Sequence, residues 1–125
     1  MNTCAVQANN IKYKRSGKQI LDVEQFCLEQ GEIMALIGIN GSGKSTLVKM
    51  LSLLERPDSG KIFIQGEEAT PQNMLRIRRK MAVVFQEPLL LDTTVYNNVA
   101  SGLRLRGHKK TEIDSRVMEW LTRLG

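Results

Sequence analysis

The sequence has little of several features that mark other classes of protein. Its 125 residues include only two cysteines, Cys4 and Cys27, whose spacing fits no metal site, and no secretory signal is evident. We therefore expect two free thiols in a reducing compartment. The longest apolar runs, residues 33–37 and 81–85, have five residues each, against the roughly 18 that a membrane-spanning helix needs. Any membrane role is therefore expected to depend on a partner.

Charge and histidine content argue against two further classes. There are 18 Lys and Arg against 13 Asp and Glu, a net charge of +5 that suits an anionic ligand. No basic stripe interleaved with aromatic residues stands out, so nucleic acid is not an expected partner. His108, the single histidine, lies in a polar basic segment without a carboxylate or cysteine beside it, and we expect it to be solvated rather than catalytic. The length fits one domain at most.

One stretch carries a specific chemical pattern. Residues 38–46 read G-I-N-G-S-G-K-S-T, between the apolar run 33–37 and a segment of helical periodicity, and they match G-x-x-x-x-G-K-[ST], the P-loop. The glycines let successive backbone N–H groups point at phosphate oxygens. Lys44 adds a positive charge, and Ser45 opens a helix, where its hydroxyl can bind Mg²⁺ and the free N–H groups favour phosphate.

The other patterns predict an α/β chain. Strands are expected at 4–6 and 20–23 in an edge hairpin or meander, at 33–37, at 62–64 closed by Gly66, and at 81–85, buried on both faces. Helices are expected after the P-loop, at 70–80, from the Thr93-Thr94 cap, and from Thr111 as N-cap with Asp114 as its capping-box partner. Gln86 follows the strand 81–85, at the edge where open α/β sheets bind ligands.

The sequence leaves two interpretations open for Tyr13 and two for a cluster of basic residues. Tyr13 lies within the charged segment 12–18, and it is either a half-exposed strand tyrosine or a functional one. The basic cluster of Arg76 and residues 78–80 either ends a solvated helix, where the helix dipole favours it, or binds a partner or a phosphate.

The P-loop, Gln86 after the run 81–85, and Val-Tyr-Asn-Asn-Val at 95–99 together resemble the ATP-binding subunit of an ABC transporter. The resemblance extends essentially from end to end. It implies an α/β fold, the P-loop nucleoside triphosphatase fold of the ABC type. Residues 1–125 would supply an incomplete core sheet, an amino-terminal antiparallel β-subdomain and the start of the helical subdomain. It also implies ATP and Mg²⁺ as cofactors.

The resemblance assigns roles to matching positions of this sequence. It implies that Tyr13 stacks on adenine and that Lys44 reaches the β- and γ-phosphates. It implies that Ser45 and Gln86 hold Mg²⁺, with Lys44 and Gln86 as the catalytic candidates. The loop residues that wrap the β-phosphate or lie near the α-phosphate complete the nucleotide-binding set: Gly38, Asn40, Gly41, Ser42, Gly43 and Thr46.

The resemblance also implies partners and a location. The loop after Gln86, residues 87–92, matches the segment that contacts the membrane permease subunit, and a second ATP-binding subunit completes the site in a dimer. The expected location is cytoplasmic, peripheral on the inner face of the cell membrane through the permease. The segment 95–107 looks like the corresponding stretch of oxyanion importers, of the phosphate or the tungstate and molybdate type.

The sequence departs from the family pattern after Leu124. The signature Leu-Ser-Gly-Gly-Gln, a strand ending in Asp-Glu and a switch histidine are expected beyond this position and do not occur within residues 1–125. We therefore expect a partial ABC ATP-binding domain, the amino-terminal portion of an importer ATPase, that binds nucleotide weakly and hydrolyses it negligibly. Two alternatives stay open: a non-catalytic nucleotide-binding decoy module, and a fragment of a soluble ABC-type ATPase.

Overall fold

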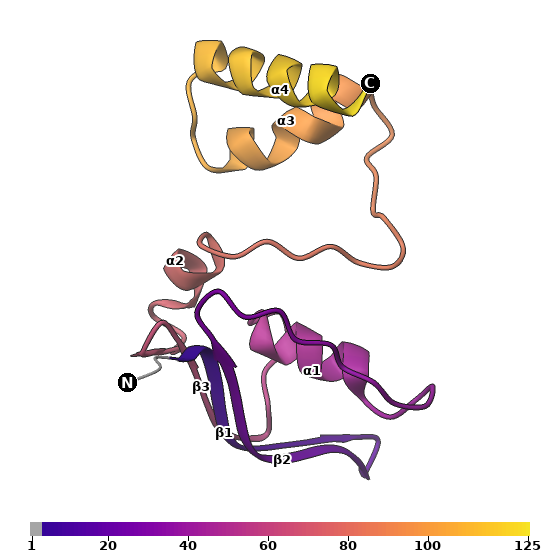
Figure 1. Ribbon diagram of the computed structural model, residues 1–125, viewed down its shortest axis with the longest axis vertical. Helices are drawn as coiled ribbons and strands as arrows, with labels where there is room; N and C mark the ends of the chain where they lie inside the picture. The colour runs from indigo at the N-terminus through magenta and orange to yellow at the C-terminus, as the bar shows by residue number, and fades with distance from the viewer. Residues whose placement is uncertain (1–3) are drawn as a thin grey trace. The chain divides into compact units, whose positions relative to one another are not determined.

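Two long strands form a hairpin at the start of the chain. In the computed structural model, which describes residues 4–125 (Figure 1), β1 spans Cys4–Arg15 and β2 spans Lys18–Glu29. Ser16 and Gly17, in the turn between them, have φ angles of 51° and 75°, as required by the hairpin turns that match strand twist. Of the hairpin and the meander that the sequence allows, the structure has the hairpin. Its strands extend into the charged segment 12–18, whose side chains are mostly exposed.

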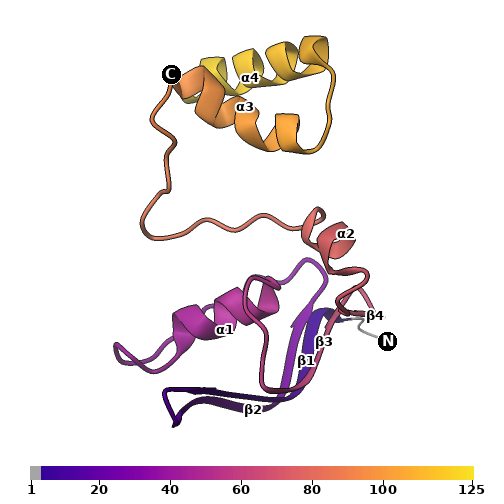
Figure 2. The same ribbon diagram turned by 180° about the vertical axis from the view of Figure 1, so that it is seen from behind.

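Two further strands complete one antiparallel sheet. β3 (Ser59–Ile64) pairs with β1, and β4 (Glu67–Glu68) pairs with β3, so that the strand order is β2-β1-β3-β4. Figure 2 shows this sheet from behind. Ile62 and Ile64 are buried, which confirms the half-buried strand that their alternation predicts.

The helices α1 (Lys44–Leu51) and α2 (Met74–Arg78) pack on this sheet. Their buried side chains meet the inward-facing side chains of the strands in one core, formed by Ala8, Ile11, Leu21, Met50, Leu53, Ile62, Ile64 and Ile77. Because burial of apolar surface is the main stabilising contribution, this core holds α1 against β1 and thereby fixes the segment that precedes α1.

α2 is shorter than the helix expected at 70–80. The Asn73 side chain accepts a hydrogen bond from the Thr70 backbone N–H at 2.7 Å and donates to the Glu68 carbonyl oxygen at 2.9 Å. These bonds make residues 70–73 a turn, because a short polar side chain competes with the helix for backbone groups. Within the basic cluster, Arg76 forms an ion pair with Glu67. The cluster is therefore not simply a solvated helix end.

The structure divides the chain into two units, Met1–Val83 and Val84–Gly125, and the second is a helical hairpin. Its helices α3 (Val95–Leu105) and α4 (Lys110–Leu124) pack through the buried side chains of Ala100, Ile113 and Val117. Among residues 4–125, no helix combines the length and the apolar character that crossing a membrane requires.

The two helices of the hairpin begin in different ways. The Thr94 hydroxyl caps α3 by accepting a hydrogen bond from the Asn97 backbone N–H at 3.1 Å, which confirms the expected cap. α4 begins at Lys110 with Lys109 as its N-cap, two residues earlier than expected, and Thr111 lies inside its first turn. Asp114 closes no capping box, because its carboxylate accepts a hydrogen bond from the Tyr96 hydroxyl of α3. The prediction of a Thr111 cap is therefore wrong.

His108 has charged partners that the sequence analysis missed. Its Nδ1 lies 3.0 Å from Glu112 Oε2, and Arg116 Nη2 lies 2.9 Å from the other oxygen of that carboxylate. The hydrogen bond from His108 is the main reason why the pKa of Glu112 is lowered, and the charges of His108 and Arg116 act in the same direction. The expectation of a simply solvated histidine is wrong, because a four-residue spacing brings the two groups together.

The two five-residue apolar runs do not form the expected strands. Residues 33–37 and 81–85 have no regular secondary structure, and Ile33 and Val84 are 98% and 96% exposed. A strand is held by ladder hydrogen bonds to its neighbours, and the one sheet within residues 4–125 contains neither run. The expected parallel strands, including burial of 81–85 on both faces, are therefore absent from the described residues.

Cys4 and Cys27 form a disulfide, with their Cα atoms 5.5 Å apart, so the prediction of free thiols is wrong. In the ladder, Cys27 lies opposite Gln7, but the register of β1 shifts between Cys4 and Val6. This irregularity brings Cys4 within the Cα separation at which a disulfide can close. The bridge joins the two strands at the end of the hairpin opposite its turn.

Candidate nucleotide-binding site

The P-loop forms a tight turn that leads directly into α1. The Ser42 backbone N–H donates to the Ile39 carbonyl oxygen at 3.2 Å, and Gly41 and Gly43 have φ angles of 81° and 92°. α1 then begins at Lys44, with Gly43 as an N-cap that provides no side-chain bond. The first N–H groups of a helix have no partner within the helix, so this end of α1 can bind an anion.

Two glycines of the loop have close neighbours at the position that a side chain would occupy. A Cβ atom at Gly43 would lie 2.8 Å from Leu21 Cδ2 and 3.0 Å from the Ile20 carbonyl oxygen on β2. A Cβ atom at Gly38 would lie 2.8 Å from Ser42 Oγ, across the loop. Gly43 is therefore required by its φ and by the backbone of β2, whereas a Cβ atom at Gly38 would require only the Ser42 hydroxyl to move. The resulting curve of bare backbone fits a phosphate group.

Lys44 extends its side chain back over the loop. Its Nζ donates to the carbonyl oxygens of Gly38 and Ile39, at 2.7 Å each, and lies 3.4 Å from Ser42 Oγ. None of these partners is a carboxylate, so the positive charge of Lys44 is not neutralised by them. An anion in the loop would attract the ammonium group more strongly than these neutral acceptors do.

Ser45 and Thr46 follow in the first turn of α1, where Ser45 is exposed and Thr46 is half-buried. A serine hydroxyl is a suitable Mg²⁺ ligand when phosphate oxygens and water supply the others. Among residues 4–125, no group of three or more His, Cys, Asp or Glu side chains could hold a metal by itself. Ser45 can supply one ligand to a metal whose other ligands are phosphate oxygens and water.

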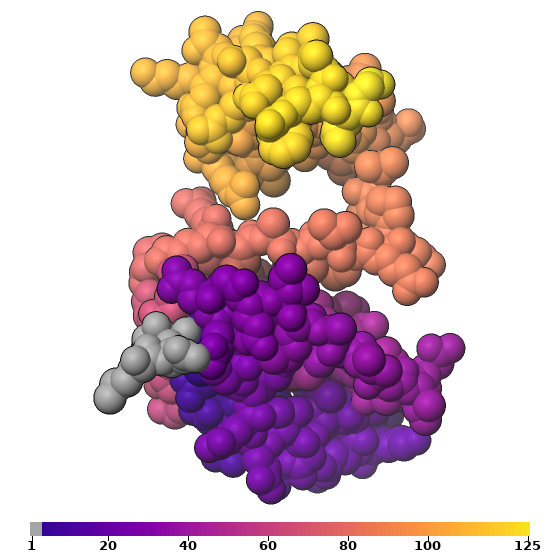
Figure 3. Space-filling model, viewed as in Figure 1, coloured from indigo at the N-terminus to yellow at the C-terminus, as the bar shows by residue number. Residues whose placement is uncertain are grey.

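A hollow of about 420 Å³ lies between the P-loop and β2. Gly38, Ser42 and Lys44 line one side of it, and residues 20–23 line the other. The approach to the loop is open, because all of residues 31–40 are exposed. Figure 3 shows the purple segment before α1 on the surface of the first unit.

Tyr13 lies on the same face of the hairpin as the P-loop. In the ladder it pairs directly with Leu21, and directly paired residues share one face of a sheet. Leu21 in turn lies beneath Gly43. The Tyr13 ring is half-buried, and its hydroxyl donates a hydrogen bond to the Glu55 carboxylate. This bond is the main cause of the raised pKa of Tyr13.

Gln86 belongs to the second unit, whereas the P-loop and Tyr13 belong to the first. It occupies an exposed bend between Val84 and α3, where no strand precedes it. The structure thus brings together the P-loop residues and Tyr13 within the first unit. Gln86 belongs to the segment that leads to the helical hairpin.

Sequence analysis missed Asn98, which organises the end of the loop after Gln86. Its side-chain amide accepts from the Leu91 backbone N–H at 2.8 Å and donates to the Leu91 and Thr94 carbonyl oxygens at 3.0 and 3.1 Å. A polar side chain one turn into α3, after a Thr-Thr cap, was a usable signal. Sequence analysis also missed Glu55 as the partner of Tyr13, since 42 positions separate the two.

The sheet, α1 and the glycine-rich loop between them define a protein of the P-loop nucleotide-binding class. The sequence profile of the family described as "ABC transporter" matches residues 21–125. The chain belongs to the ABC transporter family.

Individual relatives agree with this assignment. The chain is 42% identical over 116 residues to the methionine import ATP-binding protein MetN 1 of Listeria monocytogenes, covering 88% of this chain and 34% of that protein. It is 40% identical over 110 residues to the energy-coupling factor transporter ATP-binding protein EcfA2 of Acetivibrio thermocellus, covering 86% and 39%. The chain thus spans between a third and two fifths of the length of these relatives.

A solved structure supports the fold. The chain is similar to cbiO1 of Clostridium perfringens, described as part of the ABC transporter complex cbiONQ, with 28% identity and a TM-score of 0.79. The likeness covers 97% of this chain and 50% of that one. The expected fold, a P-loop ATPase fold of the ABC type with an antiparallel amino-terminal sheet, is confirmed.

Proposed function

We propose that the chain binds ATP as part of the energy-coupling subunit of an ABC import system. The observation that carries the proposal is the P-loop: Gly43 packs closely on β2 at the start of α1, and Lys44 lies over the loop with only neutral partners. In this proposal the loop residues Asn40, Gly41, Ser42 and Gly43 wrap the β-phosphate. Lys44 moves from the Gly38 and Ile39 carbonyl oxygens to the β- and γ-phosphates, and Thr46 lies near the α-phosphate.

Ser45 would hold the Mg²⁺ that accompanies the nucleotide, and Tyr13 would stack on the base. When bound, Mg²⁺ neutralises charge on the β- and γ-phosphates. Gln86 would contribute as a metal ligand or by orienting water, once its segment meets the nucleotide. Hydrolysis also needs an aspartate on the metal and charge stabilisation from several sides. We propose that residues 1–125 alone supply binding without measurable turnover.

The loop after Gln86 is the proposed contact with a membrane permease subunit. Leu89 and Leu90 are 89% and 74% exposed, and such apolar exposure on a short loop suits a protein partner. Asn98 and the Thr94 cap hold the end of this loop on α3. A second ATP-binding subunit is the proposed partner across the nucleotide. These partners would place the protein at the cytoplasmic face of a membrane.

The similarity of segment 95–107 to oxyanion importers gains no support from the relatives named above. Their names refer to methionine import and to an energy-coupling factor transporter. The transported solute contacts the permease in such systems, so the residues of this chain favour no solute class. We therefore restrict the proposal to ATP.

Lys44→Ala tests the proposed function. We expect Mg-ATP to bind the 125-residue chain, and the substitution to weaken binding by about tenfold to 100-fold, since hydrogen bonds to charged groups contribute about 1.5–3 kcal/mol. Lys49→Ala removes the same charge from an exposed position of the same helix and should leave affinity within about twofold. Calorimetric titration measures both. Equal affinity of Lys44→Ala and the parent chain would refute the proposal.

A further inference from the structure

A short segment after α1 holds the strand that carries Tyr13. We call residues Glu55–Asp58 the strap. The Asp58 backbone N–H donates to the Lys12 carbonyl oxygen at 2.9 Å, and Asp58 Oδ2 accepts from the Lys14 backbone N–H at 2.6 Å. The strap therefore binds the backbone on both sides of Tyr13. Glu55 accepts the hydrogen bond from the Tyr13 hydroxyl, so the side chain is held as well.

The strap begins where the pairing of β1 with β3 ends. β3 begins at Ser59, whose ladder partner is Lys12, and no residue of β3 pairs with Tyr13 or Lys14. The register between β1 and β2 also shifts between Tyr13 and Lys14. Beyond Lys12, β1 therefore keeps only β2 as a neighbouring strand, and the register shift disturbs that pairing next to the Tyr13 ring. The three strap contacts fix the ring.

The strap belongs to the same continuous segment as the P-loop. α1 begins at Lys44, directly after the loop, and ends at Leu51, four residues before Glu55. On the hairpin, Leu21 lies under Gly43 and directly opposite Tyr13. One end of α1 therefore forms the phosphate loop, and the chain leaving its other end holds the tyrosine on the same face of the sheet.

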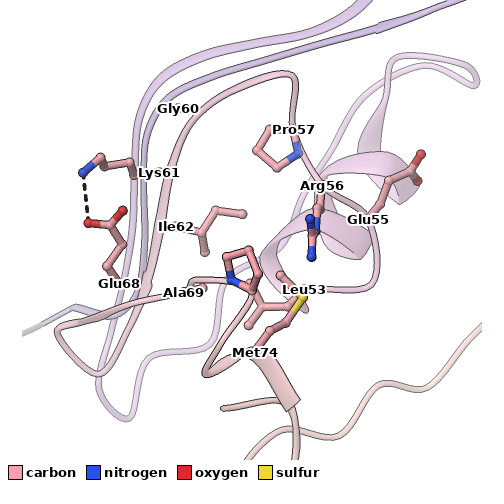
Figure 4. Close-up of a pocket in the computed structure, with 11 residues that line it drawn as sticks. Leu53, Glu55, Arg56, Pro57, Gly60, Lys61, Ile62, Glu68, Ala69 and Met74 are labelled. Carbon is pink, nitrogen blue, oxygen red and sulfur yellow. Dashed lines mark hydrogen bonds and ion pairs between the residues drawn. The ribbon is translucent and has the colours of Figure 1, made fainter. Parts of the chain in front are cut away.

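Within residues 4–125, the hydrogen bond from Tyr13 is the one side-chain hydrogen bond of Glu55, and its carboxylate forms no ion pair there. Figure 4 shows the small hollow on the far side of the strap, with an apolar floor that includes Leu53, Ile62 and Met74 and with an ion pair between Lys61 and Glu68 at its rim. In this view Glu55 points away from the hollow. Its carboxylate thus faces Tyr13 and not the hollow that its backbone borders.

We propose that Glu55 and Asp58 are positioning residues that hold the Tyr13 ring for stacking on the nucleotide base. The inference rests on the proposed function, since it presumes that the base stacks on Tyr13. It adds a physical link between the two halves of the nucleotide site: α1 and the strap fix the separation between the phosphate loop and the base platform. The raised pKa of Tyr13, caused first by the hydrogen bond to Glu55, is consistent with a hydroxyl that stays protonated.

Calorimetric titration with ATP and with inorganic tripolyphosphate, which has no base, separates base contacts from phosphate contacts. We expect Glu55→Ala and Tyr13→Phe each to weaken ATP binding by about threefold to tenfold, the range of one hydrogen bond, and to leave tripolyphosphate binding unchanged. The double variant should be no weaker than either single one, because both remove the same bond. Glu55→Gln keeps an acceptor and should restore ATP affinity.

Controls make each outcome decisive. Glu24→Ala removes one negative charge from an exposed position of β2 and should change neither ligand. Equal weakening of ATP and tripolyphosphate by Glu55→Ala would overturn the inference, because it would reveal damage to α1. If Tyr13→Ala weakens ATP and Glu55→Ala does not, the strap inference fails while stacking stands. If Tyr13→Ala leaves ATP binding unchanged, stacking on Tyr13 fails and the inference fails with it.

Discussion

Gly43 meets two separate requirements of the P-loop. Its φ of 92° lies in the region that residues with a side chain rarely adopt, and a Cβ atom there would also collide with Leu21 and with the Ile20 carbonyl oxygen. Gly17, in the hairpin turn, has a φ of 75° but no heavy atom within 4 Å of a Cβ position. Comparing substitutions at Gly17 and Gly43 therefore distinguishes the cost of backbone strain, which both positions share, from the cost of close packing, which only Gly43 has.

Gly43→Ala should destabilise the first unit more than Gly17→Ala does. We expect about 1–2 kcal/mol for Gly17→Ala, from the left-handed backbone alone, and roughly a further 1–3 kcal/mol for Gly43→Ala, from overpacking against β2. Urea denaturation measures both free energies of unfolding. Only Gly43→Ala should also weaken ATP binding, and equal effects of the two substitutions on stability would contradict the packing argument.

At the scale of the element, the N-termini of α3 and α4 show that a tertiary contact can override a local capping signal. Thr94 and Thr111 both precede or open an apolar helix, and the sequence predicts a cap at each. Thr94 makes the cap bond, whereas Thr111 lies inside α4 and Asp114 bonds to Tyr96 instead. The contact between α3 and α4 therefore decides which residue begins α4.

Thr94→Ala should cost about 1 kcal/mol of stability in the helical hairpin, the usual value for a lost N-cap. Thr111→Ala should change stability by less than about 0.5 kcal/mol, because no cap bond is lost. Far-ultraviolet circular dichroism during urea denaturation compares the two variants. A larger loss for Thr111→Ala than for Thr94→Ala would show that α4 begins as the sequence suggested.

The P-loop could be predicted from the sequence because all of its constraints are local. Glycines, lysine and serine within nine residues specify the turn, the charge and the helix start. The bond between Tyr13 and Glu55 could not be predicted, because it depends on the register of β3 against β1. The prediction of strands at 33–37 and 81–85 was wrong for a related reason. An apolar composition indicates that a segment favours burial, but it does not determine which strand the segment pairs with.

At the scale of the molecule, the disulfide between Cys4 and Cys27 adds a constraint to the first unit. It joins positions 23 apart in the sequence, and a closed loop of this size contributes about 3 kcal/mol in the chain-entropy description. We expect dithiothreitol to lower the free energy of unfolding of the parent chain by about that amount and to leave Cys27→Ser unchanged. Labelling of both cysteines by maleimide before reduction would contradict the bridge.

The central claim is that the backbone of the P-loop binds the phosphates of ATP, and amide chemical shifts of the ¹⁵N-labelled chain test it most directly. On addition of Mg-ATP, the account predicts the largest shifts at Gly41, Gly43, Lys44 and Ser45, smaller shifts near Tyr13, and none at α4. Tripolyphosphate should reproduce the P-loop shifts without those near Tyr13. Unchanged P-loop amides at saturating Mg-ATP, or shifts confined to other residues, would contradict the account.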